Sequence, residues 1–390
     1  LCYNDISAMS RLHRSASAQM SRPAISIQKS GGWTFGSPSV LMMFYRAPGE
    51  LQSELQEMDE CMPHYYKITN GHGQGAETIM RAEADFMRAC FADAQIMLER
   101  AYAQIGGNGQ ENMALCCDFL AWRLSLCTSF TPRESFEQRR EALLQQHNVA
   151  WLNILQSSCA YYYALLGLPE KIPAVFREHQ LASIHFLAPG KPMMELIENQ
   201  VYLAQGEYAK VIGHSEALLG MCEAMHYALV ALHIRLQTAA AYEMLGKRET
   251  ADELLISALA AAEPDALYLP FVENYRYLKT ALTRGAGAKF AAFVRTVTPL
   301  GEDFVRRCGE KRAEGSRPAA LAGLTERESA IAALVAKRLS NREIAEQLFL
   351  SEGSVKQYIN QIYSKLLITG DVRTKRTVSY THLRAHETLM

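Results

Sequence analysis

The sequence lacks the patterns of a secreted, membrane-inserted or disulfide-stabilised protein. It has no run of about 18 uncharged apolar residues and no signal peptide, so we expect a cytoplasmic protein with no membrane partner. Its nine cysteines are an odd number. None stands in a C-x-x-C pair or beside histidines at zinc-finger spacing. We therefore expect a reducing compartment, no disulfide framework and no metal site.

Sequence patterns typical of catalysis are also missing. The chain has no H-E-x-x-H, no G-x-S-x-G and no P-loop. The glycine-rich stretch 70–75 favours a plain loop over a phosphate cradle, because no strand precedes it and no Gly-Lys-Ser/Thr follows. We expect no nucleotide site, no cofactor and no enzymatic activity. Catalytic groups scattered along the chain would escape such a search, so an enzyme stays one alternative.

Length and composition are those of an ordinary globular protein. A chain of 390 residues, 49% hydrophobic and 21% charged, is long enough for two or three domains. The net charge of -1 argues neither for nor against a nucleic-acid partner. Its distribution is uneven, since residues 324–376 hold nine basic and six acidic side chains. Charge alone does not separate this excess from a chance fluctuation.

A helical repeat with a period near forty occupies residues 76–308. The turn glycines Gly167, Gly206 and Gly246 are 39 and 40 residues apart, and Ala89 lies two periods before the first. Recurring alanines and tyrosines accompany them. The clearest unit consists of Ala239, Tyr242, Gly246, Ala251, Leu255, Ala258 and Pro264.

This unit predicts a tetratricopeptide-like pair of antiparallel helices. Small residues such as Ala239 and Ala251 allow close approach, and Tyr242 and Leu255 fill the seam between the helices. We predict an all-α fold, an α-solenoid of such hairpins followed by a small three- to four-helix domain. A solenoid leaves a concave surface for a ligand or partner. An irregular all-α domain with accidental spacing is the alternative.

The remaining boundaries follow from changes in composition. Residues 1–75 are expected to be irregular, apart from one short helix near 50–61, and to be a possible remnant of an upstream domain. Residues 309–323 have linker composition. A compact module is expected over 324–378, and residues 379–390 continue no earlier pattern, so we interpret them as a non-native tail.

The module at 324–378 carries three helix-start signals in close succession. Thr325 with Glu328, and Ser340 with Glu343, form capping boxes, and Ser351 is placed to cap a third helix. Each signal precedes apolar residues at helical spacing. The expected core is Leu334, Ile344, Ala345, Leu348, Val355, Ile359, Ile362 and Leu366.

Three short helices with tight turns fit a helix-turn-helix, whose last helix enters the major groove of DNA. With Val355 and Ile359 facing inward, Lys356, Gln357 and Asn360 share the outward face. Lysine pairs with guanine, and glutamine and asparagine pair with adenine, so these three are the candidate base-reading residues. The candidates for phosphate contacts and positioning are Ser340, Asn341, Arg342, Ser351, Ser354 and Lys365.

These motifs resemble the LuxR-type DNA-binding domains. The likeness covers about 50 residues and rests on 324–328, 339–351, 354–356 and 362–366. It implies a double-stranded DNA partner, RNA polymerase recruitment and self-association on DNA. Tyr358 and Leu367 depart from the histidine and glycine that are frequent there. The family's fourth helix would follow Arg373 and run into the suspected tail.

The upstream region is similar, less specifically, to the helical sensor arm of MalT-like regulators. The segments 167–173 and 202–208 and the unit at Gly246 carry the likeness, which implies an inducer bound by the repeat. The ATPase module of those regulators is absent. The chain is therefore either a fragment, which Leu1 favours, or a regulator that works without that module. A repeat-based interaction scaffold with a degenerate helix-turn-helix is the other function considered.

Overall fold

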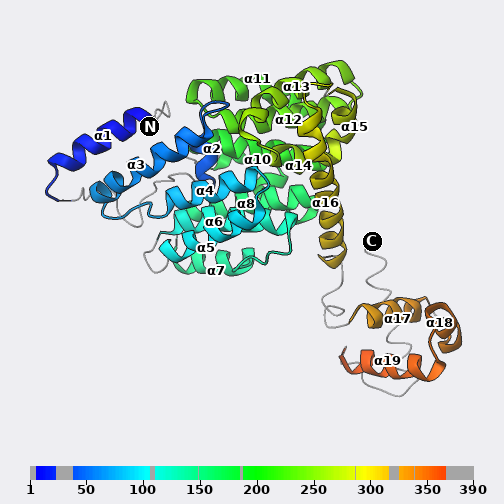
Figure 1. Cartoon of the computed structure of the whole chain (residues 1–390). Coiled ribbons are helices and arrows are strands. Elements are labelled where there is room, and N and C mark those ends of the chain that lie inside the picture. Colours follow the sequence, from blue (N-terminus) through cyan, green and yellow to red (C-terminus); the bar gives the residue numbers. More distant parts are fainter. Residues whose placement is uncertain are drawn as a thin grey trace. The chain divides into compact units, whose positions relative to one another are not determined.

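The structure is a computed structural model, and the residues it describes are all in helices, turns and loops (Figure 1). It describes residues 6–22, 38–105, 110–147, 149–184, 188–285, 287–315, 325–337 and 339–365. The chain forms two compact units, Leu1–Gly309 and Glu310–Met390, called unit 1 and unit 2 below. The predicted all-α class is confirmed.

Unit 1 is built from helices that pack mostly on their neighbours in sequence. The first group is α1 (Ile6–Gln19), α2 (Val40–Phe44), α3 (Leu51–Thr69), α4 (Ala76–Met87), α5 (Phe91–Ile105), α6 (Glu111–Cys127), α7 (Phe136–Gln145) and α8 (Val149–Leu166). The second is α9 (Ala174–Arg177), α10 (Lys191–Gln205), α11 (Tyr208–Met225), α12 (Ala228–Met244), α13 (Arg248–Ala262), α14 (Leu269–Glu273), α15 (Tyr275–Gly285) and the part of α16 (Ala291–Gly315) up to Gly309.

The predicted turn glycines end helices in one shared geometry. Gly167, Gly206 and Gly246 have φ of +74°, +78° and +74°, where a side chain would be strained. In each turn the residue after the glycine donates its backbone N–H to the carbonyl of a tyrosine five positions back, at 2.9–3.0 Å. This Schellman arrangement satisfies a carbonyl that the helix end would leave unpaired.

Ala89 occupies the same turn position although it is not glycine. Its φ is +59°, and Cys90 N–H donates to the Asp85 carbonyl at 2.8 Å, as in the glycine turns. The turn joins α4 to α5, two periods before Gly167. The turn of the repeat is thus present here, although the left-handed backbone of an alanine costs about 1–2 kcal/mol.

The α12–α13 hairpin packs as its sequence predicts. Ala239, Ala251, Leu255 and Ala258 are fully buried in the seam, and Tyr242 is half-buried at its edge. The unit that follows Gly167 departs from the pattern. Pro169 and Pro173 interrupt its second helix, because proline lacks the N–H that a helix interior needs. Only the four-residue α9 and short 3-10 turns remain there.

The five residues of α2 lie inside unit 1. All five are buried, and the helix packs against α4 and α12. Leu41 N–H donates to the buried carboxylate of Glu83 on α4 at 2.7 Å. Ala228 N–H, at the start of α12, donates to the Tyr45 carbonyl at 3.0 Å. Part of the chain itself therefore bridges an early and a late helical hairpin.

Two segments differ from the expectations for irregular structure. The described residues within 1–75 include α1, α2 and α3, of which α3 continues through Pro63 to Thr69, beyond the predicted short helix. Cys61, Met62 and Tyr65 are buried on α3, so packing stabilises the helix despite the proline. At the predicted linker, α16 continues to Gly315. The suspected tail, 379–390, lies outside the described residues.

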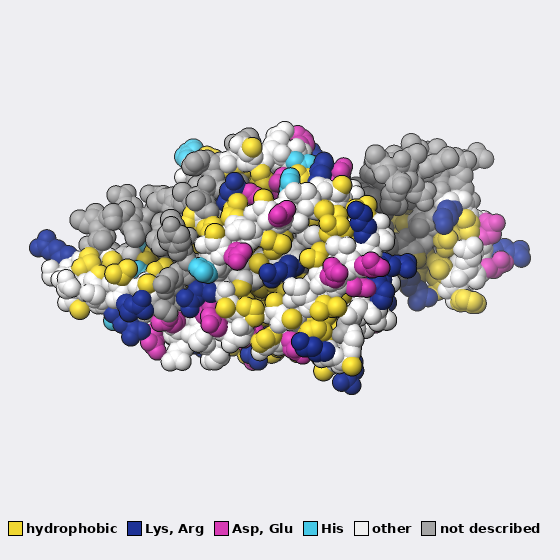
Figure 2. Space-filling model, turned by 90° about the horizontal axis from the view of Figure 1, so that it is seen from above, with side chains coloured by type: hydrophobic (Ala, Val, Ile, Leu, Met, Phe, Trp, Pro, Cys, Tyr) yellow, Lys and Arg dark blue, Asp and Glu magenta, His cyan; other side chains and the backbone are white. Residues whose placement is uncertain are grey.

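Charges of both signs are mixed over unit 1. On the face drawn in Figure 2, Lys and Arg side chains alternate with Asp and Glu rather than forming one basic field. Among the described residues, no helix is long and apolar enough to cross a membrane. The same residues contain no group of three or more His, Cys, Asp or Glu side chains placed to hold a metal ion.

Candidate nucleic-acid interface

Among the residues of unit 2 that the structure describes after α16, there are three short helices, α17 (Glu326–Ala336), α18 (Asn341–Leu348) and α19 (Glu352–Lys365). Both predicted capping boxes are present. Glu328 N–H donates to Thr325 Oγ1 at 3.3 Å, and Thr325 N–H donates to Glu328 Oε2 at 2.7 Å. Ser340 and Glu343 repeat this exchange at 3.3 and 2.6 Å. Each box satisfies two backbone donors at a helix start and so fixes where the helix begins.

Ser351 caps the start of α19, as predicted. Ser354 N–H donates to Ser351 Oγ at 3.1 Å, and the two hydroxyls share a hydrogen bond of 2.8 Å. Between α18 and α19 the chain turns at Phe349, which has φ of +53°. Its ring is 95% exposed. Phe349 was not predicted from the sequence, because no helical period marks such a turn residue.

The apolar residues of the three helices form one small core, separate from that of unit 1. Of the predicted core, Leu334 and Leu348 are half-buried against it, and Leu366 lies outside the described residues. The other predicted members are buried: Ile344, Ala345, Val355, Ile359 and Ile362. Ile331, Ala332, Val335 and Tyr363 are also buried in it. Tyr363 was missed because its neighbour Ile362 already continued the i+3, i+4 series.

Lys356, Gln357 and Asn360 are all exposed on α19, on the side away from this core. None of the three has a hydrogen-bond or ion-pair partner among the residues that the structure describes. Lysine offers a charged donor, and the two amides each offer a donor and an acceptor. The three predicted base-reading residues therefore lie on one exposed side of α19, and their polar groups have no partner among the described residues.

The predicted phosphate-contacting residues are placed less uniformly. The hydroxyls of three of them form the hydrogen bonds at the helix starts described above: Ser340, Ser351 and Ser354. Arg342 pairs with Glu346 at 3.1 Å on the exposed side of α18. Asn341 is half-buried, and its Oδ1 has no hydrogen-bond partner among the described residues.

Lys365 takes part in an interaction that the sequence analysis did not predict. Its Nζ donates to Glu328 Oε2 at 2.7 Å, which ties the end of α19 to the start of α17. Hydrogen bonds from Lys365 and from the Thr325 backbone lower the pKa of Glu328. The 37-residue separation of this pair explains why no local spacing indicated it. The Lys365 charge is therefore already engaged within the domain.

Residues 322–377 match a known family, the bacterial regulatory proteins of the luxR family. The C-terminal domain is of the luxR type. The LuxR-type resemblance predicted from the sequence is confirmed for this segment, whereas the MalT-like likeness of the upstream region stays a prediction.

Two curated relatives match a short part of the chain. The transcriptional regulatory protein LnrK of Bacillus subtilis is 41% identical over 63 residues, 15% of this chain and 29% of the relative. The DNA-binding transcriptional activator DevR/DosR of Mycobacterium tuberculosis is 36% identical over 64 residues, 16% of this chain and 29% of that protein. The chain thus spans less than a third of the length of each relative. No solved structure matches the chain.

Proposed function

We propose that the chain is a transcriptional regulator whose luxR-type domain binds double-stranded DNA through α19. The observation that carries this proposal is the division of α19 into two sides. Val355, Ile359 and Ile362 are held in the core, while the polar ends of Lys356 and its outward neighbours have no partner among the described residues. A helix anchored in this way can present side chains to base edges without losing its own packing.

Lys356, Gln357 and Asn360 are the proposed base-reading residues, and backbone N–H groups at the starts of α18 and α19 are the proposed phosphate contacts. Arg342 adds a positive charge at the start of α18. Its ion pair with Glu346 is exposed to water and therefore weak, so Arg342 can still attract a phosphate. Lys365 acts in this proposal through Glu328, by holding α19 in place. Recruitment of RNA polymerase and self-association on DNA belong to the same proposal.

Unit 1 is proposed to receive the signal that controls this binding. Its tetratricopeptide-like hairpins, such as α12–α13, support a MalT-like sensor role, and a ligand or protein bound there would be the inducer. An interaction scaffold with a degenerate helix-turn-helix fits less well. All three helix starts are capped, and the described core residues of the luxR-type domain are apolar and buried. A degenerate domain has no reason to keep both features.

The test is to select genomic fragments with the full chain and to measure its affinity for the best fragment. Binding is followed at about 50 and about 200 mM salt, because phosphate contacts make affinity fall with salt. Lys356→Ala and Asn360→Ala should each weaken binding to the selected sequence by about 1–3 kcal/mol, the value of one good pairing between a side chain and a base edge.

Lys289→Ala serves as the matched control. Lys289 is an exposed lysine of unit 1, so this variant removes the same charge from a residue outside the luxR-type domain. It should keep the parent's affinity. Unchanged affinity of both α19 variants for the selected sequence would refute the base-reading assignment, and failure of the full chain to retain any fragment would refute DNA binding.

A further inference from the structure

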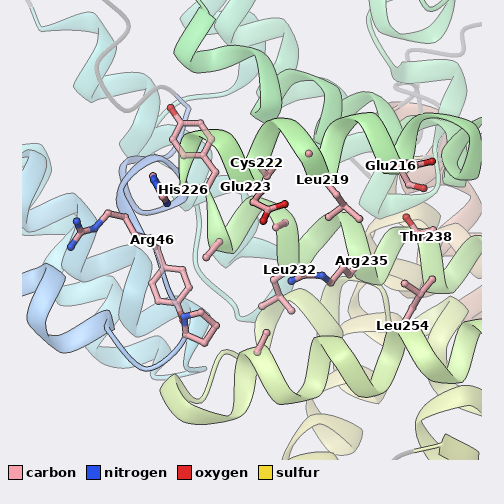
Figure 3. Close-up of a pocket in the computed structure, with 18 of the residues that line it drawn as sticks. Arg46, Glu216, Leu219, Cys222, Glu223, His226, Leu232, Arg235, Thr238 and Leu254 are labelled. Atoms are coloured by element: carbon pink, nitrogen blue, oxygen red, sulfur yellow. The ribbon is translucent and has the colours of Figure 1, made fainter. Parts of the chain in front are cut away.

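A groove of about 780 Å³ opens between α11, α12 and α13 in unit 1 (Figure 3). This volume is within the range of small-molecule sites. Its walls are largely apolar and include Leu219, Leu232 and Leu254. Tyr45 and Pro48, which follow α2, also line it.

Hydrogen bonds hold Tyr45 in place beside the groove. The hydroxyl of Tyr45 donates to Asp265 Oδ2 at 2.7 Å, and Gly49 N–H donates to the same oxygen at 2.6 Å. Tyr45 itself is almost fully buried. This part of the groove wall is therefore fixed before a ligand binds, and preformed sites bind ligands at lower entropic cost.

Arg235 of α12 projects into this groove and differs from comparable arginines. It is half-buried, and it has no hydrogen bond or ion pair with any residue in the described ranges. Figure 3 shows its side chain between α11 and α13, with Glu216 and Glu223 on the α11 side. Neither carboxylate is within ion-pair distance of it.

The other buried or half-buried arginines described in unit 1 all have acceptors. Their partners are Glu54 for Arg46, Asp59 for Arg81, Glu273 for Arg123, Asp118 for Arg139, the Leu165 carbonyl for Arg276 and Asp303 for Arg307. A guanidinium that loses water without gaining an acceptor costs free energy. An anionic ligand would offset this cost by accepting hydrogen bonds from Arg235. The planar guanidinium matches a carboxylate, which can accept two such bonds.

We propose that this groove binds a small apolar carboxylic acid, whose carboxylate pairs with Arg235 and whose hydrocarbon part lies against the leucines. The apolar walls favour a hydrocarbon body. Glu216 and Glu223 at the rim repel multiply charged anions such as phosphate and accept an ammonium group, so apolar amino acids are included. That this ligand is the regulatory signal rests on the proposed function, whereas the binding site itself does not.

The probes are 4-methylpentanoate and leucine, with leucinamide as the analogue without a carboxylate and inorganic phosphate as the competing anion source. Each is titrated into the full chain by calorimetry. Both carboxylates should bind, and leucinamide and phosphate should not. Arg235→Gln should weaken carboxylate binding about ten- to hundredfold, the value of a charge-assisted pair. Arg248→Gln, an exposed arginine of α13 outside the groove, should bind like the parent.

Arg235→Lys guards against a folding defect in the glutamine variant. It keeps the charge but not the fork, and its affinity should lie between those of parent and Arg235→Gln. Equal carboxylate binding by parent and Arg235→Gln overturns the proposal, as does no binding of either carboxylate. DNA affinity, measured with and without leucine, is a separate readout. If the full chain binds the carboxylates but binds no DNA either with or without leucine, the proposed function is refuted and the groove remains a ligand site.

Discussion

Arg123 and Glu273 form an ion pair at the centre of unit 1, and breaking it should be among the most costly changes in the chain. Arg123 Nε and Nη2 donate to the two Glu273 carboxylate oxygens at 2.8 and 3.1 Å, and the Tyr161 hydroxyl donates to the same carboxylate at 2.8 Å. Both charged side chains are 1% exposed. Burial opposes the charge on Arg123, yet Glu273 holds the pKa of Arg123 above its ordinary value.

Removing Glu273 leaves the Arg123 charge buried without its carboxylate acceptor. Removing Arg123 leaves the Glu273 carboxylate buried with the Tyr161 hydroxyl as its remaining side-chain donor among the described residues. Arg123→Met and Glu273→Leu should therefore each lower the free energy of unfolding by about 3–5 kcal/mol. The double variant should cost clearly less than the two single variants together, because it buries no unpaired charge. A total stability of about 5–15 kcal/mol makes each single change readily measurable.

Urea unfolding followed by tryptophan fluorescence reports on unit 1 alone, because Trp33, Trp122 and Trp151 all precede Gly309. Glu60→Gln is the matched control. Glu60 pairs with Arg14 at 2.6 Å, but both side chains are nearly half exposed, so its loss should cost under about 1 kcal/mol. Single variants that cost no more than this control, or a double variant that costs the sum, would contradict the reasoning.

Three further predictions concern packing and protonation. Ile359→Asp puts an unpaired carboxylate into the small core of unit 2 and should unfold that unit; hydrogen exchange at 325–365 as slow as in the parent would contradict this. Gly301→Ala would place a Cβ 2.2 Å from a Tyr275 ring carbon, and should lower the free energy of unfolding, measured in urea, by about 1–3 kcal/mol. Burial raises the pKa of Glu83 to about 7, so the parent should lose stability as pH rises from about 5 to about 8, relative to Glu83→Gln. A constant difference between these two across that range would show that Glu83 stays ionised.

The parts of the structure that the sequence predicted are set by interactions between residues near in the chain. The caps at Thr325, Ser340 and Ser351 each join a side chain to a backbone N–H three positions on. The turns at Gly246 and Ala89 depend on one residue's left-handed backbone and a hydrogen bond across five positions. Such features have fixed spacings, and a spacing can be recognised without knowing the fold.

The parts that the sequence did not predict depend on interactions between distant residues. Arg123 and Glu273 are 150 positions apart. The five residues of α2 form a buried helix because α4 and α12 enclose them, and no period in 40–44 indicates that. Pro63 predicts a helix end, but the packing of α3 overrides it. The candidate groove likewise could not be predicted from the sequence, since Tyr45 and Arg235 both line it only because of the fold.

Both proposed ligand surfaces include polar side chains that have no partner among the described residues, but the free-energy cost of this differs between them. Lys356, Gln357 and Asn360 are exposed, so water satisfies them, and their freedom from protein partners alone adds little free energy to DNA binding. Arg235 is half-buried and has lost part of that water. The free protein has therefore already lost part of the hydration free energy of Arg235. A ligand acceptor that pairs with Arg235 offsets this loss, so a single pair in the groove can contribute more to binding than a single pairing on α19.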